Sequence, residues 1–293
     1  MTSFFRSIGR FEIGRIEEVV EPLATPERWF GPFDRAVFEA ELAHCPANAY
    51  DWKTGQLMAS IHSWLLRVDG KVILIDTCCG NGKNRPGWPG FHQLNYPYLE
   101  RLHAAGVSPE DVDIVLCTHL HVDHVGWNTR QEGGRWVPTF PNARYLVARQ
   151  ELETMLARIA RPETHPIERM TWNDSVLPIE EAGLLELTAS SCVVLPGLRL
   201  EPAHGHTPGH VAIHLESRGE RAVFSGDALH FPVQVPLWHW PAIVDKDPAQ
   251  GIATRRELLE NCAETGAWLL PAHFSAPHGV KISRRDDSFA IIC

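Results

Sequence analysis

The feature that most constrains this chain is a run of histidines and one aspartate that follows a short apolar stretch. Residues 113–117 are mostly apolar and predict a buried strand. They lead into residues 118–126, which contain the pattern H-x-H-x-D-H. Imidazole and carboxylate are the ligands that zinc-like divalent metals prefer. Packing gives no reason to cluster them, because each group would have to be desolvated and hydrogen-bonded. The run therefore indicates a metal site, with two metals rather than one.

Three further polar clusters also follow apolar stretches. The first is Gly-His-Thr-Pro-Gly-His at 205–210, the second is Ser-Gly-Asp-Ala at 225–228, and the third is Pro-Ala-His-Phe at 271–274. Each places a histidine or an aspartate where a predicted strand ends, and the relevant residues are His206, Asp227 and His273. Histidine and aspartate side chains thus recur at predicted strand ends and in the loops that follow them. This recurrence is a second indication of a metal site.

The pattern of the chain predicts strands in two groups with helices between them. Ile61–Val68 and Lys71–Asp76 are expected to form a hairpin through Asp69-Gly70. Apolar residues at 152, 155, 156 and 159 predict a helix that Pro162 stops. Asp247-Pro248 begins another helix, which Gly266 ends. Residues 163–190 are expected to be helix or loop.

The whole chain, residues 1–293, is expected to form one domain. Residues 1–55 have weak periodicity and several prolines, so we expect an N-terminal arm or a lid. Residues 56–293 would then form the catalytic body. Short apolar runs at 193–195, 198–201, 211–215, 221–225 and 267–270 predict the strands of its C-terminal part.

Composition excludes some partners and compartments. The formal net charge is −9 and no Lys/Arg-rich run occurs, which argues against a nucleic-acid partner. No stretch is long and apolar enough for a membrane helix, and the first residues lack the apolar core of a signal peptide. The seven cysteines are an odd number without a C-x-x-C pair. We therefore expect a reduced, cytoplasmic protein without a membrane partner.

Taken in order, the four motifs resemble those of the metallo-β-lactamase superfamily, and in particular its acyl-homoserine lactonase and methyl parathion hydrolase-like branch. The resemblance extends from Ile61 to Phe274 and includes Asp76, which matches the family's early strand-end aspartate. It implies an α/β fold of the αββα type, in which two mixed β-sheets are flanked by helices.

The resemblance also implies the roles of the motif residues. One metal would be held by His119, His121 and His206, the second by Asp123, His124 and His273, and both would be bridged by Asp227. Asp76 would orient a ligand histidine. Because His119 and His121 are two residues apart, extended backbone would point both side chains the same way. The related redox branch with iron usually has Glu at the position of His121, so we predict Zn²⁺, with Co²⁺, Mn²⁺ or Fe²⁺ as alternatives.

Two divalent ions would lower the pKa of a shared water and supply a bridging hydroxide as the nucleophile. Asp123 is the candidate for relaying a proton to the leaving group. His230 stands three residues after Asp227, where the acyl-homoserine lactonases have tyrosine, and it is a candidate substrate contact or a hydrogen-bonded neighbour of the metal site. These residues predict a dinuclear lactonase or related esterase that acts on a small molecule.

Other functions remain as alternatives. Within hydrolases they are an organophosphate (phosphotriester) hydrolase and a glyoxalase II-like thioesterase; outside them, they are a non-catalytic metal-binding protein and a di-iron redox protein. The negative net charge and the absence of Lys/Arg-rich runs disfavour a ribonuclease. The first residues lack a signal-peptide pattern, which disfavours an exported β-lactamase. The aromatic segment Trp238-His239-Trp240 could line a pocket, form a dimer contact or edge the core. The arm rich in proline and aromatic residues is compatible with a homodimer.

Overall fold

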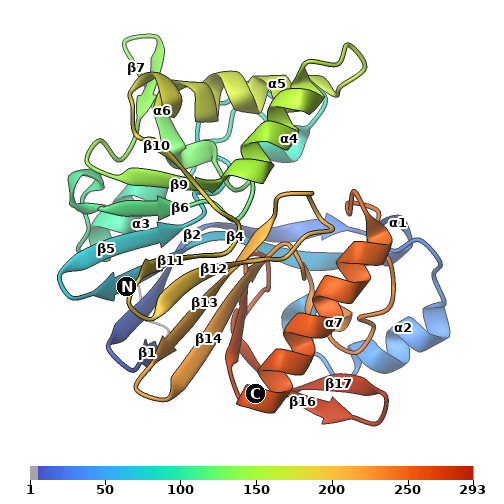
Figure 1. Ribbon diagram of the computed structural model, residues 1–293. Helices are drawn as coiled ribbons and strands as arrows, with labels where there is room; N and C mark the ends of the chain where they lie inside the picture. Colours follow the sequence, from blue (N-terminus) through green and yellow to red (C-terminus); the bar gives the residue numbers. More distant parts are fainter. Residues whose placement is uncertain (1–5, 293) are drawn as a thin grey trace. The chain divides into compact units, whose positions relative to one another are not determined.

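Two mixed β-sheets and the helices that pack on them account for most of residues 6–292, which this computed structural model describes (Figure 1). The backbone contacts divide the chain into two compact units. Unit 1 comprises the residues up to Val19 together with Ile61–Ala189, and unit 2 comprises Val20–Ser60 together with the residues from Ser190 onward. The boundaries fall within the long strands β2 (Phe11–Ala24) and β4 (Gln56–Val68). Each unit has its own core and is described by itself.

The larger sheet has eight strands, with β3 paired to β4 beside the path β1-β2-β4-β5-β6-β9-β10. β1 pairs antiparallel with β2 and β4 pairs antiparallel with β5, whereas β5, β6, β9 and β10 are parallel to one another. The hairpin from β4 to β5 turns at Asp69-Gly70, as predicted. The bounds of the strands other than β2 and β4 are Arg6–Ile8 (β1), Tyr50–Asp51 (β3), Lys71–Ile75 (β5), Ile114–Leu116 (β6), Arg144–Ala148 (β9) and Leu185–Thr188 (β10).

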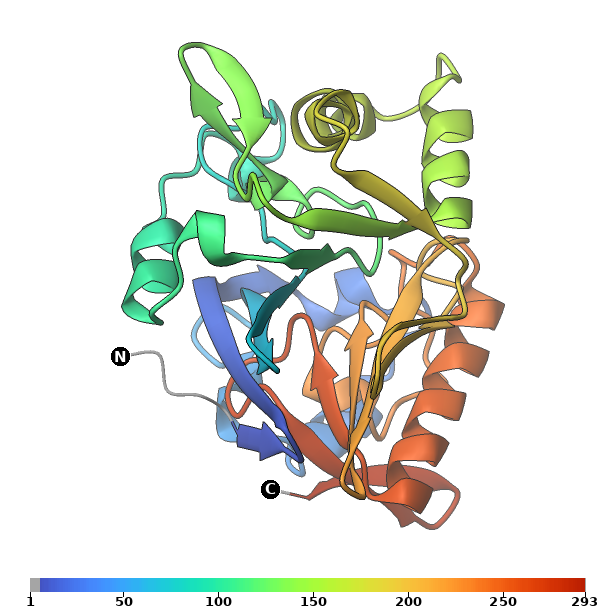
Figure 2. The same ribbon diagram turned by 60° about the vertical axis from the view of Figure 1, so that its left-hand side comes forward.

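The helices of unit 1 bury apolar side chains in the core that the parallel strands share. Leu102 from α3 (Tyr98–Ala104) and Leu152 from α4 (Arg149–Ile159) lie in one buried cluster with Leu74 and Val115. Figure 2 shows α4 beside the strands β9 and β10 and the hairpin of β7 (Thr129–Glu132) and β8 (Arg135–Pro138) extending away from them. The rest of this part is α5 (Pro166–Thr171), a π-helical turn (Trp172–Val176) and α6 (Leu177–Glu181).

The seven-stranded sheet of unit 2 runs in chain order from β11 to β17, and its only parallel pair among the described strands is β14 with β15. The helix α7 (Pro248–Thr265) packs along β14 and β16 (Figure 1). Its Leu258, Leu259 and Cys262 enter the core of this unit. The bounds of the strands are Cys192–Leu195 (β11), Leu198–Pro202 (β12), Val211–Ser217 (β13), Glu220–Gly226 (β14), Trp268–Pro271 (β15), Val280–Arg285 (β16) and Ser288–Ile292 (β17).

The ends of α7 follow the chemistry of its sequence. Asp247 precedes the helix, and its carboxylate accepts a hydrogen bond from the Gln250 N–H, which has no partner inside the helix. At the other end, Gly266 has φ of 65° and takes the left-handed conformation that glycine adopts at low cost. The predicted bounds of this helix are therefore confirmed.

Two segments contain structure that the sequence pattern did not predict. In the N-terminal 55 residues, β1 and β2 are strands of the eight-stranded sheet, and α1 (Pro26–Trp29) and α2 (Arg35–Leu42) follow them. In the stretch 163–190, the strand β10 pairs parallel with β9. Strand pairing supplies hydrogen bonds that weak local periodicity does not reveal.

The expectations of one domain and of a lid stay predictions. Within residues 6–292 no helix combines the length and the apolar character needed to cross a membrane.

A buried group of charges ties the loop after β5 to the π-helical turn in unit 1. Arg85 is fully buried and donates two hydrogen bonds, at 2.6 and 2.8 Å, to the two carboxylate oxygens of Asp174. The Lys83 Nζ lies 3.6 Å from the same carboxylate and 3.8 Å from the centre of the Trp136 ring. Burial lowers the pKa of Lys83 to about 7, and Asp174 opposes this shift. The single carboxylate thus compensates two buried basic groups.

We expect Asp174→Ala to lower the free energy of unfolding by about 3–5 kcal/mol, because it leaves buried cations without their partner. The measurement is urea denaturation followed by tryptophan fluorescence. Glu186→Ala is the control: its ion pair with Arg144 is also bidentate, but the two side chains are 44% and 56% exposed. Loss of that pair should cost under about 1 kcal/mol. Equal losses in the two variants would contradict this account of the buried cluster.

A second prediction concerns His214 on β13. Burial, aided by nearby Arg199, lowers the pKa of its imidazole to about 4. The unfolded chain would titrate this group near 6.5, so the folded state binds fewer protons between these two values. The stabilisation is complete above pH 6.5 and is lost as the pH falls toward 4.

We therefore expect the free energy of unfolding of the metal-free protein to fall between pH 6.5 and 4 by roughly 2 kcal/mol more than that of His214→Gln. Urea titrations at a series of pH values in the presence of chelator measure the difference. Parallel pH dependences for the two proteins would show that His214 is not the group responsible.

Candidate metal-binding residues

The H-x-H-x-D-H run lies directly after β6, whose three residues are all buried. His119 and His124 are buried, whereas His121 and Asp123 are partly exposed. The ring centre of His119 is 4.5 Å from that of His121 and 4.1 Å from that of His124. The run therefore gathers its imidazoles at the carboxyl end of a central strand of unit 1, as predicted.

Asp76 orients this group from the end of β5. Its Oδ1 accepts the Thr118 N–H, and its Oδ2 accepts both the Thr118 hydroxyl and the His124 Nδ1–H, each at 2.8 Å. Since the Thr118 hydroxyl donates to Asp76, its oxygen is left to accept from His119 Nδ1, 3.1 Å away. Both imidazoles then carry their proton on Nδ1 and present the lone pair of Nε2, the form in which histidine binds a metal. Asp76 thus orients the imidazole of His124, and the role of His124 as a metal ligand stays a prediction.

A buried glutamate on β2 holds the loop that follows Asp76. Glu18 accepts the backbone N–H groups of Cys79 and Gly80 at 2.8 and 3.0 Å and the indole N–H of Trp127 at 2.7 Å. Burial raises the pKa of its carboxyl, and these hydrogen bonds oppose the rise. The Gly126 N–H also donates to the Cys78 carbonyl. The loops that carry Asp76 and His124 are thereby fastened to each other. Glu18 was not predicted as a functional residue, because the strand β2 that places it inward was not predicted either.

In unit 2, three imidazoles converge on the carboxylate of Asp227, which follows β14. The Nε2 of His273 lies 3.1 Å from Oδ1, the Nε2 of His206 lies 3.2 Å from Oδ2, and the Nε2 of His230 lies 3.1 Å from Oδ2. All four residues are at most 3% exposed. Both oxygens of Asp227 therefore face an imidazole nitrogen, an arrangement that suits a carboxylate bridging two cations.

Neighbouring groups fix the orientation of these side chains. His273 Nδ1 donates to the Ser60 carbonyl at 3.2 Å, which leaves Nε2 toward Asp227. His210 Nδ1 donates to the Ala203 carbonyl, and its Nε2 accepts the Asp227 backbone N–H at 3.0 Å. Both ring nitrogens of His210 are thus engaged in hydrogen bonds to backbone groups, and His210 positions the aspartate.

Asp245 and Arg255 were missed by the sequence analysis. Asp245 Oδ1 lies 3.4 Å from His206 Nδ1, and its Oδ2 lies 3.2 Å from Arg255 Nη2. Burial raises the pKa of Asp245, and the charge of Arg255 opposes the rise. Asp245 stands in an irregular segment two residues before the N-cap of α7, with no motif around it. No signal in one sequence distinguishes it from a surface aspartate.

The aromatic segment at 238–240 belongs to the edge of a core. Trp240 is 9% exposed and contacts Phe30 and Phe33 edge-on, with ring centres 5.3 and 5.8 Å apart. Trp29, from α1, packs edge-on against the His230 ring at 4.8 Å. Of the three interpretations left open for this segment, core packing holds for Trp240, whereas His239 is exposed and Trp238 is partly exposed. Trp29 is thus an aromatic neighbour of His230.

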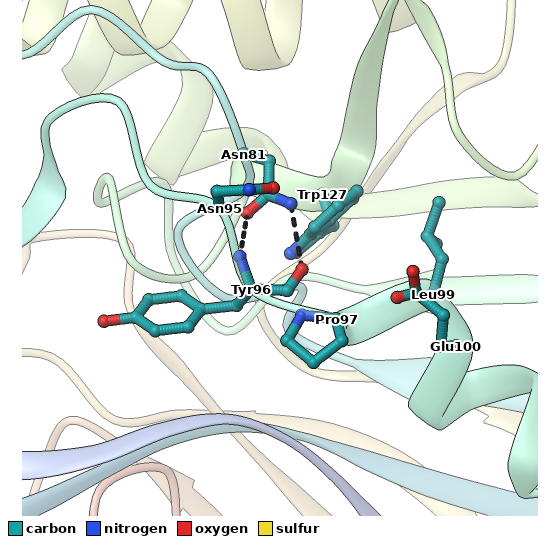
Figure 3. Close-up of a pocket in the computed structure, with 7 residues that line it drawn as sticks. All are labelled: Asn81, Asn95, Tyr96, Pro97, Leu99, Glu100 and Trp127. Atoms are coloured by element: carbon teal, nitrogen blue, oxygen red, sulfur yellow. Dashed lines mark hydrogen bonds between the residues drawn. The ribbon is translucent and has the colours of Figure 1, made fainter.

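A separate pocket lies in unit 1 and has a volume of about 330 Å³ (Figure 3). Figure 3 shows the Asn81 side chain hydrogen-bonded to the backbone of Tyr96, and both bonds are 2.8–2.9 Å long. The candidate ligands are not among the described residues that line it, which are Asn81, Asn95, Tyr96, Pro97, Leu99, Glu100 and Trp127. This pocket is therefore distinct from the clustered histidines and aspartates.

The donor set fits divalent metal ions. Of the candidate ligands in unit 1, His119 and His121 offer ligand atoms within 4.8 Å of each other, as do Asp123 and His124, and in unit 2 so do His206 and Asp227. The imidazoles of His119, His124 and His273 direct Nδ1 to an oxygen and leave Nε2 available. A chain that used these residues only for packing would not need this common orientation.

Comparisons with known proteins agree with the motifs. N-acyl homoserine lactonase AiiB of Agrobacterium fabrum is 35% identical over 80 residues, which are 22% of this chain and 28% of that protein. Ribonuclease TTHA0252 of Thermus thermophilus is 30% identical over 166 residues, which are 56% of this chain and 34% of that protein. The matches thus cover about a third or less of these relatives' own lengths.

Solved structures share the fold over the whole chain. Hydrolase AbOPH of the beta lactamase superfamily has a TM-score of 0.82 at 24% identity, and the match covers 100% of this chain and 97% of that one. AidC, a dizinc quorum-quenching lactonase, has a TM-score of 0.79 at 20% identity, with 98% and 95% covered. The family model of the metallo-beta-lactamase superfamily matches residues 59–273, which include all of the candidate ligands. The chain belongs to the metallo-beta-lactamase superfamily and has its fold.

Proposed function

We propose that this protein is a dinuclear metal-dependent hydrolase that opens a lactone or cleaves a related ester. The observation that carries the proposal is the carboxylate of Asp227, whose two oxygens each face a buried imidazole Nε2 at 3.1–3.2 Å. A carboxylate with both oxygens presented in this way suits two cations better than one. The lactonases among the relatives and similar structures support the choice of substrate class.

Following the family's motifs, one ion would be held by His119, His121 and His206, the other by Asp123, His124 and His273, and Asp227 would bridge them. Zinc is the proposed metal, because imidazole and carboxylate ligands without thiolate suit it and because His121 stands at the second motif position. When bound, the two ions would supply an activated water and polarise the scissile carbonyl.

Asp123 and His230 are the side chains proposed to act on the reacting groups. Asp123 is partly exposed, so its carboxylate can carry a proton to the leaving oxygen after the acyl bond breaks. His230 Nε2 donates to Asp227, because an ionised carboxylate can only accept. Its Nδ1 is then a buried acceptor, and among residues 6–292 it has no hydrogen-bond partner. That nitrogen is proposed to receive a hydrogen bond from the substrate.

The function is tested by proton release from the zinc-loaded protein against a matched set of substrates. We expect turnover of acyl-homoserine lactones or simple γ- and δ-lactones that chelator abolishes and added zinc restores. The set also holds aryl esters, a glutathione thioester and an aryl phosphotriester. Preference for the thioester or the phosphotriester would select the corresponding alternative function. Lactone turnover that survives complete metal removal would overturn the proposed mechanism.

The ligand assignment is tested by Asp227→Ala. We expect this variant to lose both ions, because the substitution removes the carboxylate that faces His206 and His273. Metal content per chain after gel filtration, measured by mass spectrometry of the elements, gives the result. Asp287→Ala removes the same charge from an exposed turn and should keep both ions. An Asp227→Ala protein that retains two ions and full activity would refute the assignment.

A further inference from the structure

The carboxylate of Asp245 stands between a ligand histidine and a fixed arginine. Its Oδ1 lies 3.4 Å from His206 Nδ1, while its Oδ2 accepts a hydrogen bond from Arg255 Nη2 at 3.2 Å. Asp245 is 7% exposed and Arg255 is fully buried. The two carboxylate oxygens thus have different neighbours: the imidazole of His206 for Oδ1 and the guanidinium of Arg255 for Oδ2.

Arg255 cannot follow a displaced carboxylate, because three backbone carbonyls hold its guanidinium. Its Nε donates to the Ala228 carbonyl at 2.9 Å, and its Nη1 donates to the carbonyls of Trp238 and Trp240 at 2.8 and 3.0 Å. The remaining nitrogen, Nη2, is the one directed at Asp245. A guanidinium fixed in this way defines where Oδ2 lies and, through the rigid carboxylate, where Oδ1 lies.

The backbone of the His206 loop is fastened to the segment that carries Asp245. The Lys246 N–H donates to the His206 carbonyl at 3.2 Å, and the Asp247 N–H donates to the Gly205 carbonyl at 2.9 Å. A Cβ on Gly205 would lie 2.3 Å from the Gly251 nitrogen, so the loop approaches α7 as closely as two glycines allow. The imidazole and the carboxylate are therefore held at a set separation.

We infer that Asp245 is a positioning residue that keeps the His206 proton on Nδ1 and so leaves Nε2 free to bind a metal ion. The inference rests on the proposed function, in which His206 is a ligand. A neutral imidazole has one proton, and an ionised carboxylate next to Nδ1 can only accept. The proton is thus held on Nδ1, and the lone pair of Nε2 is directed toward Asp227 and the ion.

Substitution by asparagine should reverse this effect. In Asp245→Asn the amide oxygen is required by Arg255, which can only donate, so the amide NH₂ would face His206 Nδ1. Nδ1 would then have to accept, and the proton would move to Nε2, where it opposes metal binding. We expect Asp245→Asn to lower the affinity for one of the two ions about 10–100-fold, although the substitution is nearly isosteric.

Asp247→Asn is the matched control. It removes the same charge two residues away, and asparagine caps a helix as well as aspartate does. Gly251→Ala provides an independent variant, because the new Cβ would lie 2.7 Å from Asp245 Oδ2 and displace the carboxylate without changing any charge. Alanine also favours the helix by about 1 kcal/mol, so a loss of metal in this variant would not reflect a weaker α7.

Two measurements test whether Asp245 keeps the His206 proton on Nδ1. Competition of zinc with a chromophoric chelator gives the two affinities, and nitrogen-15 spectra of histidine-labelled, zinc-loaded protein report the Nδ1–H of His206. We expect the wild type and Asp247→Asn to bind both ions and to show this proton. Asp245→Asn and Gly251→Ala should lose affinity at one site, and Asp245→Asn should also lose the Nδ1–H signal.

Wild-type affinity at both sites in Asp245→Asn, with the Nδ1–H signal retained, would overturn the inference while leaving the proposed function intact. Wild-type affinity at both sites in Gly251→Ala would also count against it. Failure of the wild type to bind two ions at all would instead overturn the proposed function. If Asp245→Asn does not fold, Gly251→Ala keeps the inference testable, because it retains both charged groups.

Discussion

The geometry of the candidate ligands depends on buried imidazoles whose Nδ1–H groups donate hydrogen bonds to oxygen atoms. In unit 1, His124 donates to Asp76 and His119 to the Thr118 hydroxyl. In unit 2, His273 donates to the Ser60 carbonyl. A buried imidazole without such a partner would carry the cost of an unsatisfied polar group. Once Nδ1 is satisfied, the ring is held in one orientation and Nε2 is the only nitrogen left for a ligand.

Apolar strands make this burial possible. β6 is buried along its whole length, so the chain leaves the core of unit 1 at a defined point and direction. The turn after it stays rigid because its backbone N–H groups have specific acceptors, such as the Asp76 carboxylate for Thr118. Hydrophobic packing thus supplies the position and hydrogen bonds supply the orientation. Neither alone would bring imidazoles of one tautomer together.

What the sequence could predict follows from how local each signal is. The H-x-H-x-D-H run, the hairpin at Asp69-Gly70 and the caps of α7 are set by neighbouring residues, and the structure confirms these elements. β10 depends on β9, a strand distant in the sequence, and β2 lies in the sheet between the neighbouring β1 and the distant β4; the periodicity of β2 and β10 is too weak to identify them. Glu18 and Asp245 were missed for a similar reason, since Glu18 accepts hydrogen bonds from the remote loop at Cys79 and Asp245 lies next to the remote His206.

The pairing of Asp245 with Arg255 is hard to explain by stability alone. Taking both charges out of water costs several kcal/mol per ion, and a well-packed apolar pair of similar size is often as stable or more so. The arginine also uses three backbone carbonyls that loops could satisfy with water. What an apolar pair could not supply is an anionic acceptor at a fixed distance from His206 Nδ1. The burial of this pair is therefore better accounted for by the orientation of the histidine than by the free energy of unfolding.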